Sequence, residues 1–446
     1  MVAYSSMITT GVNWIPQIPS HWELRKIDAL FTERRQKVSD KEYEPLSVTK
    51  NGVLPQLEHA AKSNDSDNRK LVKSGDFVIN SRSDRKGSCG ISQRDGSVSL
   101  INLVLTPRCG LNREYIHYLL RNYRFSEEYY RNGRGIVADL WTTRYSEMRT
   151  IQLPIPPRAE QDQIVRFLDW KVSEINKLIK LRVEEISLLK EMHEVQARNI
   201  VKNGLQNKKV KETGIDYIGS IPSHWEVLLN SRVFKERIRS FTGSPLVLSL
   251  SQKDGLIPYK EMSERSLHTS SYANWKLVFQ NDLVLNRFKA HLGVFFSSKY
   301  EGIVTFHYGV FEPRIKVNSK YYEILYHTPE YKAVFAGQSN GMTVGLQNLS
   351  NQHFYSVYTV YPPYEEQCEI VEEISKKEKE TKDKINLLRK NIEILSELKS
   401  VIISDVVTGK IDVRNATIPE YEHVDDVTDN DSDNDNEAAE AGEEEG

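Results

Sequence analysis

Two short basic loops carry the side chains most able to bind another molecule. They are the stretches 81–87 and 287–293, and the candidate contact residues are Arg82, Arg85, Lys86, Arg287, Lys289 and His291, with Asn286 directly before the second stretch. Two later loops, after Gly135 and Gly341, add the candidates Trp141, Arg144, Gln347 and Asn348. Arginine can donate two hydrogen bonds to one guanine, and asparagine or glutamine can pair with adenine in the same two-point way. The loops therefore fit contact with nucleic-acid bases or phosphates, two modes that sequence does not separate; the alternative is ordinary solvated charge.

The charge distribution favours a polyanionic partner. The 446-residue chain has a formal net charge of −2, but residues 420–446 contain thirteen Asp or Glu and no Lys or Arg. Residues 1–419 therefore carry a net charge of +11. A basic body fits nucleic acid. The acidic tail is interpreted as disordered and solubilising; the sharper alternative is a DNA mimic that competes for the basic face.

The sequence contains no recognisable catalytic or cofactor motif. It lacks GxxxxGK[ST], GxSxG and HExxH, and its 11 histidines have no metal-ligand spacing. The segment Tyr361–Tyr364 is similar to the amino-methyltransferase motif, but Tyr361 cannot replace its polar first residue. The corresponding residues of the first half, Ile155–Arg158, also contain Pro-Pro, so both segments are interpreted as helix starts. We expect no catalytic residue, no metal and no cofactor bound by this chain.

Cysteine usage and hydropathy point to the cytoplasm. The three cysteines are odd in number and none lies in a CxxC pair, which argues against a disulfide framework or a zinc site. There is no run of about 18 apolar residues and no signal-peptide layout at the start.

A repeated hexamer reveals a duplication of the whole chain. IPSHWE occurs at 18–23 and again at 221–226, an offset of 203 residues. Asp76 recurs as Asp282 and Glu160-Gln161 as Glu366-Gln367, each 206 residues later. The basic loops differ between copies, as expected of a recognition scaffold with a shared frame. The shared residues predicted to be structural anchors, which pack each globule onto its helix, are Trp22, Trp225, Pro157 and Pro363; a functional role for His21 and His224 is the alternative.

Two long helices are predicted from apolar spacing. Residues 160–201 contain no Pro or Gly and repeat apolar residues at strides of three and four, and the same pattern returns after Pro362-Pro363. At about 1.5 Å per residue each helix spans roughly 70 Å. An antiparallel pair would relate two globules by a pseudo-twofold axis and fix the spacing between two half-sites on duplex DNA.

These patterns predict an α+β fold of two mixed α/β globules joined by two long helices in an antiparallel coiled coil. The predicted domains are 1–155 (first recognition domain), 156–206 (central helix), 207–361 (second recognition domain), 362–414 (distal helix) and 415–446 (acidic disordered tail).

The ordered motifs resemble the specificity subunit of type I restriction–modification systems. The IPxxW openings, the PPxxEQ helix starts and the ending Val406–Asp412 carry this resemblance over about residues 14–414. The resemblance implies that each globule recognises half of a split, asymmetric sequence in double-stranded DNA. It also implies docking of two methyltransferase subunits, joined by restriction–translocase subunits, with S-adenosylmethionine, ATP and Mg on those partner chains.

Two other functions are compatible with the sequence. A two-headed protein-interaction scaffold would use the globules to bind proteins, and duplex binding would then show little salt dependence. A self-sufficient methyltransferase would bind S-adenosylmethionine by itself.

Overall fold

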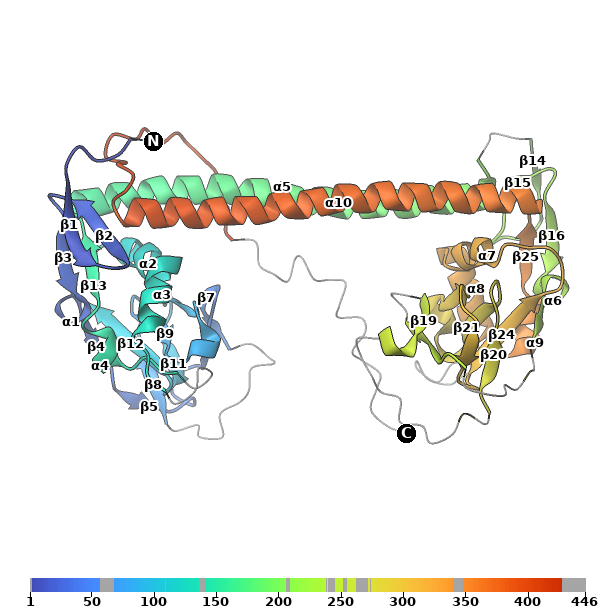
Figure 1. Cartoon of the computed structure of the whole chain (residues 1–446), viewed down its shortest axis with the longest axis horizontal. Coiled ribbons are helices and arrows are strands. Elements are labelled where there is room, and N and C mark those ends of the chain that lie inside the picture. The colour runs from blue at the N-terminus through green and yellow to red at the C-terminus, as the bar shows by residue number, and fades with distance from the viewer. Residues whose placement is uncertain are drawn as a thin grey trace. The chain divides into compact units, whose positions relative to one another are not determined.

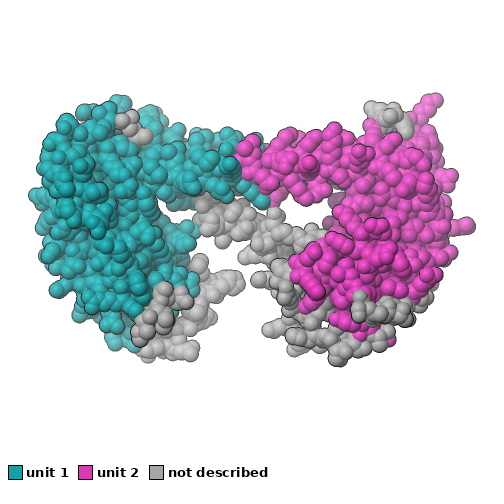
Figure 2. Space-filling model, viewed as in Figure 1, with its two compact units in different colours: residues 1–185, 388–437 teal, residues 186–387, 438–446 magenta. Residues whose placement is uncertain are grey.

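The computed structural model describes residues 2–56, 68–108, 110–135, 141–205, 209–237, 239, 245–251, 255–261, 272, 274–339 and 348–426. The chain forms two compact units, residues 1–185 with 388–437 and residues 186–387 with 438–446 (Figure 2). Each unit contains one copy of the repeat.

Unit 1 is built around an antiparallel four-stranded sheet with strand order β10-β9-β12-β4. Smaller sheets pair β1 with β2, β3 with β13, β6 with β7, and β5 and β11 with β8. The strands are β1 Met7–Val12, β2 Ile15–Pro19, β3 Glu23–Lys26, β4 Phe31–Glu33, β5 Lys37–Val38, β6 Leu46–Thr49, β7 Gly52–Pro55, β8 Arg69–Val72, β9 Phe77–Asn80, β10 Cys89–Ile91, β11 Gly96–Ser99, β12 Asn102–Pro107 and β13 Gln152–Ile155.

The central strand β9 is buried on both faces, which explains its continuous apolar run. Phe77 and Ile79 face the main core with the helices over 113–121 and 123–131, whereas Val78 joins a smaller core with Leu46 and Val98. Side chains alternate across a strand, so a sheet covered on both sides needs apolar residues at consecutive positions. The sheet is thus a rigid platform for the loops at its ends (Figure 1).

Short helices complete unit 1. They are α1 Ile27–Leu30, α2 Arg113–Arg121, α3 Tyr123–Arg131, α4 Tyr145–Met148 and the 3-10 turn η1 Ser83–Arg85. Asn112 caps α2 by accepting hydrogen bonds from the amides of Glu114 and Tyr115, and Asn122 caps α3 through the amide of Phe125. Such caps satisfy amides that lack partners in the first helical turn.

Unit 2 repeats this plan, with an antiparallel sheet in the order β17-β24-β21-β22. Its strands are β14 Val210–Glu212, β15 Ser220–Pro222, β16 Glu226–Leu229, β17 Phe234–Glu236, β18 Leu248–Ser251, β19 Gly255–Pro258, β20 Lys276–Val278, β21 Leu283–Asn286, β22 Phe295–Ser297, β23 Gly302–Val304, β24 Tyr308–Pro313 and β25 Tyr358–Tyr361. Its short helices are α6 Asn230–Val233, η3 Tyr259–Glu261, η4 Arg287–Leu292, α7 Ser319–Tyr326, α8 Pro329–Gln338 and α9 Asn351–Ser356.

The two long helices are α5 Arg158–Asn203 and α10 Tyr364–Val407. In unit 1, Ile175 and Ile179 of α5 share a core with Ile402 and Val406 of α10. In unit 2, the end of α5 meets the start of α10, where Val201 shares a core with Ile370 and Ile374. In each unit the two helices therefore run antiparallel (Figure 1). The predicted fold class, two mixed globules with a long antiparallel helix pair, is confirmed.

The chain after α10 differs from the sequence prediction over 415–426. Gln163 of α5 donates hydrogen bonds to the carbonyls of Val413 and Ala416, at 3.1 and 3.0 Å. Ile418 packs against the unit 1 core. Apolar contacts and buried donors thus hold a segment whose composition suggested disorder. Residues 427–446 lie outside the described residues.

Candidate nucleic-acid interface

A buried glutamate at the start of α5 holds the first copy of the repeated hexamer. Glu160 Oε1 accepts hydrogen bonds from Trp22 Nε1 at 3.0 Å and from the Tyr4 hydroxyl at 2.6 Å, and Oε2 lies 2.7 Å from His21 Nε2. Burial and the bond to Glu160 raise the pKa of Tyr4, which keeps its hydroxyl a donor. A side chain at Gly409, after α10, would collide with the ring of Pro19. The hexamer thus joins the start of α5 and the end of α10 to the globule of unit 1.

The second copy repeats the histidine–glutamate contact in unit 2. His224 Nε2 lies 2.7 Å from Glu366 Oε2 at the start of α10, and Trp225 is fully buried beside them. Gly204 follows α5 with φ +77°, and a Cβ there would lie 3.0 Å from Glu366 Oε1. Positive φ and close packing both favour glycine at this position.

The glutamine of each PPxxEQ segment ties the long helix to the globule. Gln161 Oε1 accepts the amide of Asn112 at 2.8 Å, and Gln367 Oε1 accepts the amide of Asn318 at 2.9 Å. Both glutamines lie in first helical turns that begin at the predicted anchors. Pro157 O accepts the Gln161 amide at 3.0 Å, and Pro363 O accepts the Gln367 amide at the same distance. These shared residues therefore make the frame and leave the loops free to differ.

A basic depression lies at one end of the unit 1 sheet. Two candidate residues far apart in sequence, Arg82 and Arg144, line it together, because a β-bridge joins Arg82 to Thr142 and the Ser83 amide donates to the carbonyl of Trp141 at 3.0 Å. Its volume is about 550 Å³, and its remaining lining residues are Glu33, Arg35, Lys70, Ser81, Leu100, Ile101, Leu103, Tyr145 and Ser146.

The charge in this depression is predominantly positive. Within the described part of the chain, no ion pair engages Arg82 or Arg144, whereas Arg35 Nε donates to Glu33 Oε2 at 2.6 Å. Lys70 Nζ donates to the carbonyl of Asn102 at 2.7 Å, and burial lowers the pKa of its ammonium. Two arginines thus remain available to an anionic or base-edge partner.

The corresponding loop of unit 2 has a different composition. Arg287 Nη2 lies 3.0 Å from Glu236 Oε1, which also lies 3.2 Å from Lys276 Nζ. Asn286 uses its side-chain oxygen to cap η4 by accepting the Phe288 amide at 3.1 Å. Arg287 is therefore paired with a carboxylate and only 16% exposed, in contrast to Arg82.

Exposed apolar residues mark the same turn in both copies. Leu100 and Ile101 precede β12 and are each 37% exposed. Their counterparts 206 residues later, before β24, are Phe306 and His307, whose rings lie 3.8 Å apart; Phe306 is 52% exposed. Phe288 of the neighbouring loop, 41% exposed, lies 6.0 Å from the His307 ring. Apolar side chains can contact a thymine methyl group or stack on a base.

Comparison with known proteins supports the same interpretation. No family model matches the chain. Over 315 residues it is 24% identical to a protein of Methanocaldococcus jannaschii described as the type I restriction enzyme MjaX specificity subunit, covering 67% of this chain and 68% of the relative. The predicted resemblance to type I specificity subunits is confirmed.

A solved structure shows the same fold. A chain from a structure described as "Structural basis underlying complex assembly and conformational transition of the type I R-M system" superposes with a TM-score of 0.59 and 13% identity, covering 88% of this chain and 99% of that one. The HsdS subunit from Thermoanaerobacter tengcongensis aligns with a TM-score of 0.46, 15% identity and coverage of 88% and 98%. The function predicted at this level, a type I specificity subunit, agrees with the description of the curated relative.

The remaining predicted residues lie around the loops of the two units. Arg85 and Lys86 lie outside the depression, where Lys86 pairs with Glu127. Trp141 is 39% exposed beside it. In unit 2, Lys289 and Asn348 are exposed, His291 is half-buried, and Gln347 lies outside the described residues.

Sequence reasoning missed Arg35 and Lys70. Arg35 lies between β4 and β5, and Lys70 lies on β8, which pairs with both β5 and β11. No local motif indicates that these two residues line one depression. Leu100 and Ile101 could have been identified from the sequence as candidate contact residues. Two large apolar residues in a turn between strands are uncommon on a solvated surface.

Among the described residues, no helix is both long and apolar enough to cross a bilayer.

Proposed function

We propose that this chain reads a split sequence in duplex DNA, one half per globule, for a type I restriction–modification complex. The observation that carries the proposal is the basic depression of unit 1. Arg82 and Arg144 converge there from separate loops without ion pairs among the described residues, next to exposed Leu100 and Ile101. Unpaired arginines beside apolar side chains are the groups that contact guanine edges, phosphates and thymine methyls.

The two halves of the site are expected to differ in sequence. The sheet, the Asn cap of α2 and α7, and the glutamate–histidine contact are the same in both units, whereas the loop surfaces are not. Unit 1 offers two arginines that form no ion pair with the described residues, and unit 2 offers Phe288, Phe306 and His307 next to Arg287, which is paired with Glu236. A shared frame with different contact groups supports an asymmetric bipartite site.

The long helices offer a surface for partner helices. Leu181, Leu188, Met192 and Val195 of α5 are 49–59% exposed and follow heptad strides of seven, four and three. Their counterparts 206 residues later on α10, Leu387, Ile394, Leu398 and Val401, are 46–61% exposed. Apolar stripes at this spacing pack against other helices. They support docking of the two methyltransferase subunits, to which restriction–translocase subunits would add.

Catalysis in such a complex would reside on the partners. The chain contains none of the nucleotide-binding or hydrolytic motifs searched for in the sequence. S-adenosylmethionine, ATP and Mg would accordingly bind partner chains, and this subunit would supply DNA recognition in the cytoplasm.

Salt dependence of duplex binding tests the proposal against a protein-interaction scaffold. With methyltransferase subunits present, the log–log plot of affinity against salt should slope steeply, at about −0.9 per phosphate contacted. Replacing Arg82 and Arg144 by Ala should reduce the slope by about 2 if both contact phosphates. Arg25→Ala, at an exposed position on β3, is the matched control. A flat slope for the unaltered complex would favour the scaffold. Methylation mapping in cells carrying the complex would then identify the two half-sequences.

A further inference from the structure

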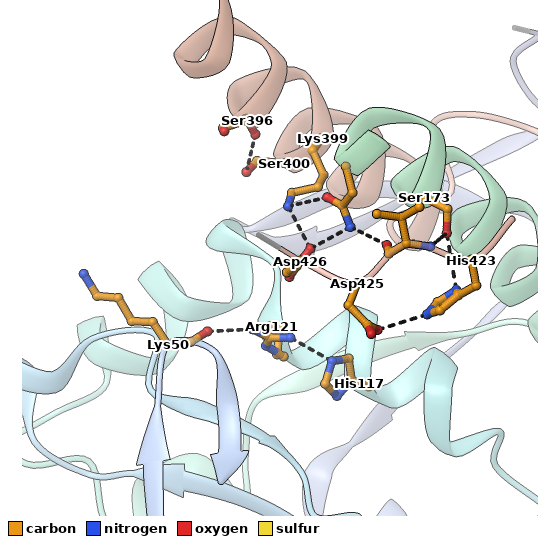
Figure 3. A network of polar contacts seen from close by, with 12 residues as sticks. Lys50, His117, Arg121, Ser173, Ser396, Lys399, Ser400, His423, Asp425 and Asp426 are labelled. Carbon is orange, nitrogen blue, oxygen red and sulfur yellow. Dashed lines mark hydrogen bonds and ion pairs between the residues drawn. The ribbon is translucent and has the colours of Figure 1, made fainter. Parts of the chain in front are cut away.

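In unit 1, the first residues of the acidic tail fill a cleft between α2, α5 and α10 (Figure 3). Asn176 Nδ2 donates to the carbonyl of Val424 at 2.9 Å and to Asp426 Oδ1 at 3.1 Å. Lys399 Nζ donates to Asp426 Oδ1 at 2.9 Å. Ser173 Oγ lies 3.3 Å from His423 Nδ1.

These contacts are those of a peptide-binding site. Ser173 and Asn176 are each 1% exposed, and the segment supplies their hydrogen-bond partners. Burial alone would raise the pKa of Asp426, but the Lys399 ammonium outweighs it and the pKa is lowered. The carboxylate is therefore held in its charged form against a cation of the helix pair.

The internal repeat places a second cleft of the same origin in unit 2. With the 206-residue offset of the repeat, the counterparts of Ser173 and Asn176 in unit 2 are Lys379 and Lys382. The counterpart of Lys399 is His193. These three residues line a cleft of about 1330 Å³ between α5, α7 and α10. The counterpart of the unit 1 trio is thus more basic.

Several donors in this cleft lack a partner. Lys299, Lys332 and Lys379 form no ion pair with any described residue, and His193 Nδ1 is buried without a hydrogen-bond partner among them. The three lysines are thus the groups of this cleft that remain open to an anionic partner. The counterpart of His193 in unit 1 is Lys399, which forms an ion pair with Asp426.

We propose that the unit 2 cleft binds an extended acidic peptide, and that the occupant is residues 427–446 of this protein. That segment holds nine Asp or Glu and no Lys or Arg, and it follows directly on the residues that fill the unit 1 cleft. The assignment is independent of DNA recognition by the loops.

The composition of cleft and tail favours a peptide over a duplex. The lining also contains the carboxylates Glu194, Glu323, Glu378 and Asp383. Carboxylates repel a continuous row of phosphates, whereas the tail alternates acidic and neutral residues, DNDSDNDN at 429–436. A peptide with this alternation can place carboxylates on lysines and amides on the carboxylates of the cleft.

Carbodiimide cross-linking of the full chain tests the proposal. This reagent joins a lysine to a carboxylate in direct contact, and mass spectrometry locates the bond. Cross-links from 429–445 should concentrate on Lys299, Lys332 and Lys379. Lys332→Glu with Lys379→Glu should lower the yield at the unaltered Lys299 roughly tenfold. Lys376→Glu with Lys390→Glu, two exposed lysines of α10 outside the cleft, should leave it unchanged.

Cross-links spread evenly over the surface lysines, or none to these three, would overturn the assignment. Addition of duplex DNA is the second arm. Cleft cross-links that persist support the peptide, and loss at an equimolar duplex in both the unaltered and the control chain assigns the cleft to DNA instead. A mixture of isotopically light and heavy chains shows whether the tail reaches the cleft of its own molecule or of a second copy.

Discussion

His21 Nε2 lies 2.7 Å from Glu160 Oε2, and the corresponding atoms of His224 and Glu366 lie 2.7 Å apart in the other unit. In unit 1 the Glu160 carboxylate also accepts hydrogen bonds from Trp22 Nε1 and from the Tyr4 hydroxyl. One glutamate at a helix start therefore satisfies three side chains of the globule that precedes it. This explains why the hexamer and the PPxxEQ segment recur together.

Glu160→Ala should destabilise unit 1. The substitution leaves the buried Trp22 Nε1 and Tyr4 hydroxyl without their acceptor, and each unsatisfied donor costs about 1–3 kcal/mol. Urea unfolding followed by tryptophan fluorescence should show the loss as a lower midpoint. Glu174→Ala, at an exposed position on the same helix, is the control and should change stability by less than about 0.5 kcal/mol. Equal midpoints for the two variants would contradict this role.

Glu330 should make the stability of unit 2 depend on pH. Burial by itself raises the pKa of this carboxyl, but hydrogen bonds from Arg198 and Lys202 outweigh it and lower the pKa to about 2 from its ordinary value of 4.5. A depressed pKa stabilises the fold above pH 4.5, and this contribution is lost as pH falls from 4.5 to 2.

The variant Glu330→Gln isolates this contribution. The difference in unfolding free energy between the unaltered chain and the variant should be about 1–3 kcal/mol at pH 7 and should approach zero near pH 2. Urea titrations at several pH values measure it. If the difference did not depend on pH, the variant would be destabilised by altered packing of the glutamine and not by loss of the ion pair.

The duplication made most of the fold predictable from sequence. Proline-free heptads predicted the long helices, and the recurrence of Asp76 as Asp282 identified equivalent strands in the two copies. Each aspartate accepts a hydrogen bond from an arginine, Asp76 from Arg34 in unit 1 and Asp282 from Arg237 in unit 2. The matching aspartates therefore make the same contact in both units.

The candidate site was less predictable because its members come from separate strands. Arg82 and Arg144 were identified by residue type, but their convergence depends on the bridge between Arg82 and Thr142. Residue type predicts the same role for Arg287 as for Arg82, although Glu236, 51 residues earlier, pairs with Arg287. Long-range pairing decides whether an arginine is available, and no local pattern records it.

Arg82 and Arg287 should therefore contribute differently to DNA binding. Arg82→Ala should weaken duplex binding by about 1–3 kcal/mol, because an unpaired arginine on the depression is removed. Arg287→Ala should weaken it less, since that guanidinium is already paired, and should instead lower the stability of the loop. Fluorescence anisotropy with a duplex containing the mapped site compares them at fixed salt. A larger loss of affinity for Arg287→Ala would refute the assignment.

Residues 14–155 should determine one half-site only. Replacing them with the matching segment of another specificity subunit keeps Glu160 and the helices, so the frame is preserved while the unit 1 loops change. Methylation mapping should show one altered half-sequence and one unaltered. Alteration of both would mean that recognition is shared between the globules.

The exposed heptad stripe should be required for assembly with partner helices. Leu188→Asp with Met192→Asp places charge on two apolar positions that are 59% and 54% exposed, so the fold of this chain should be nearly unaffected. Docking of a partner helix buries these positions, and an unpaired carboxylate there is costly. Co-purification of the methyltransferase subunits should fall at least about tenfold. Glu184→Lys with Glu191→Lys alters two exposed positions of α5 outside the stripe and should leave assembly intact. Equal recovery of partners with the stripe variant and the control would place docking elsewhere on the chain.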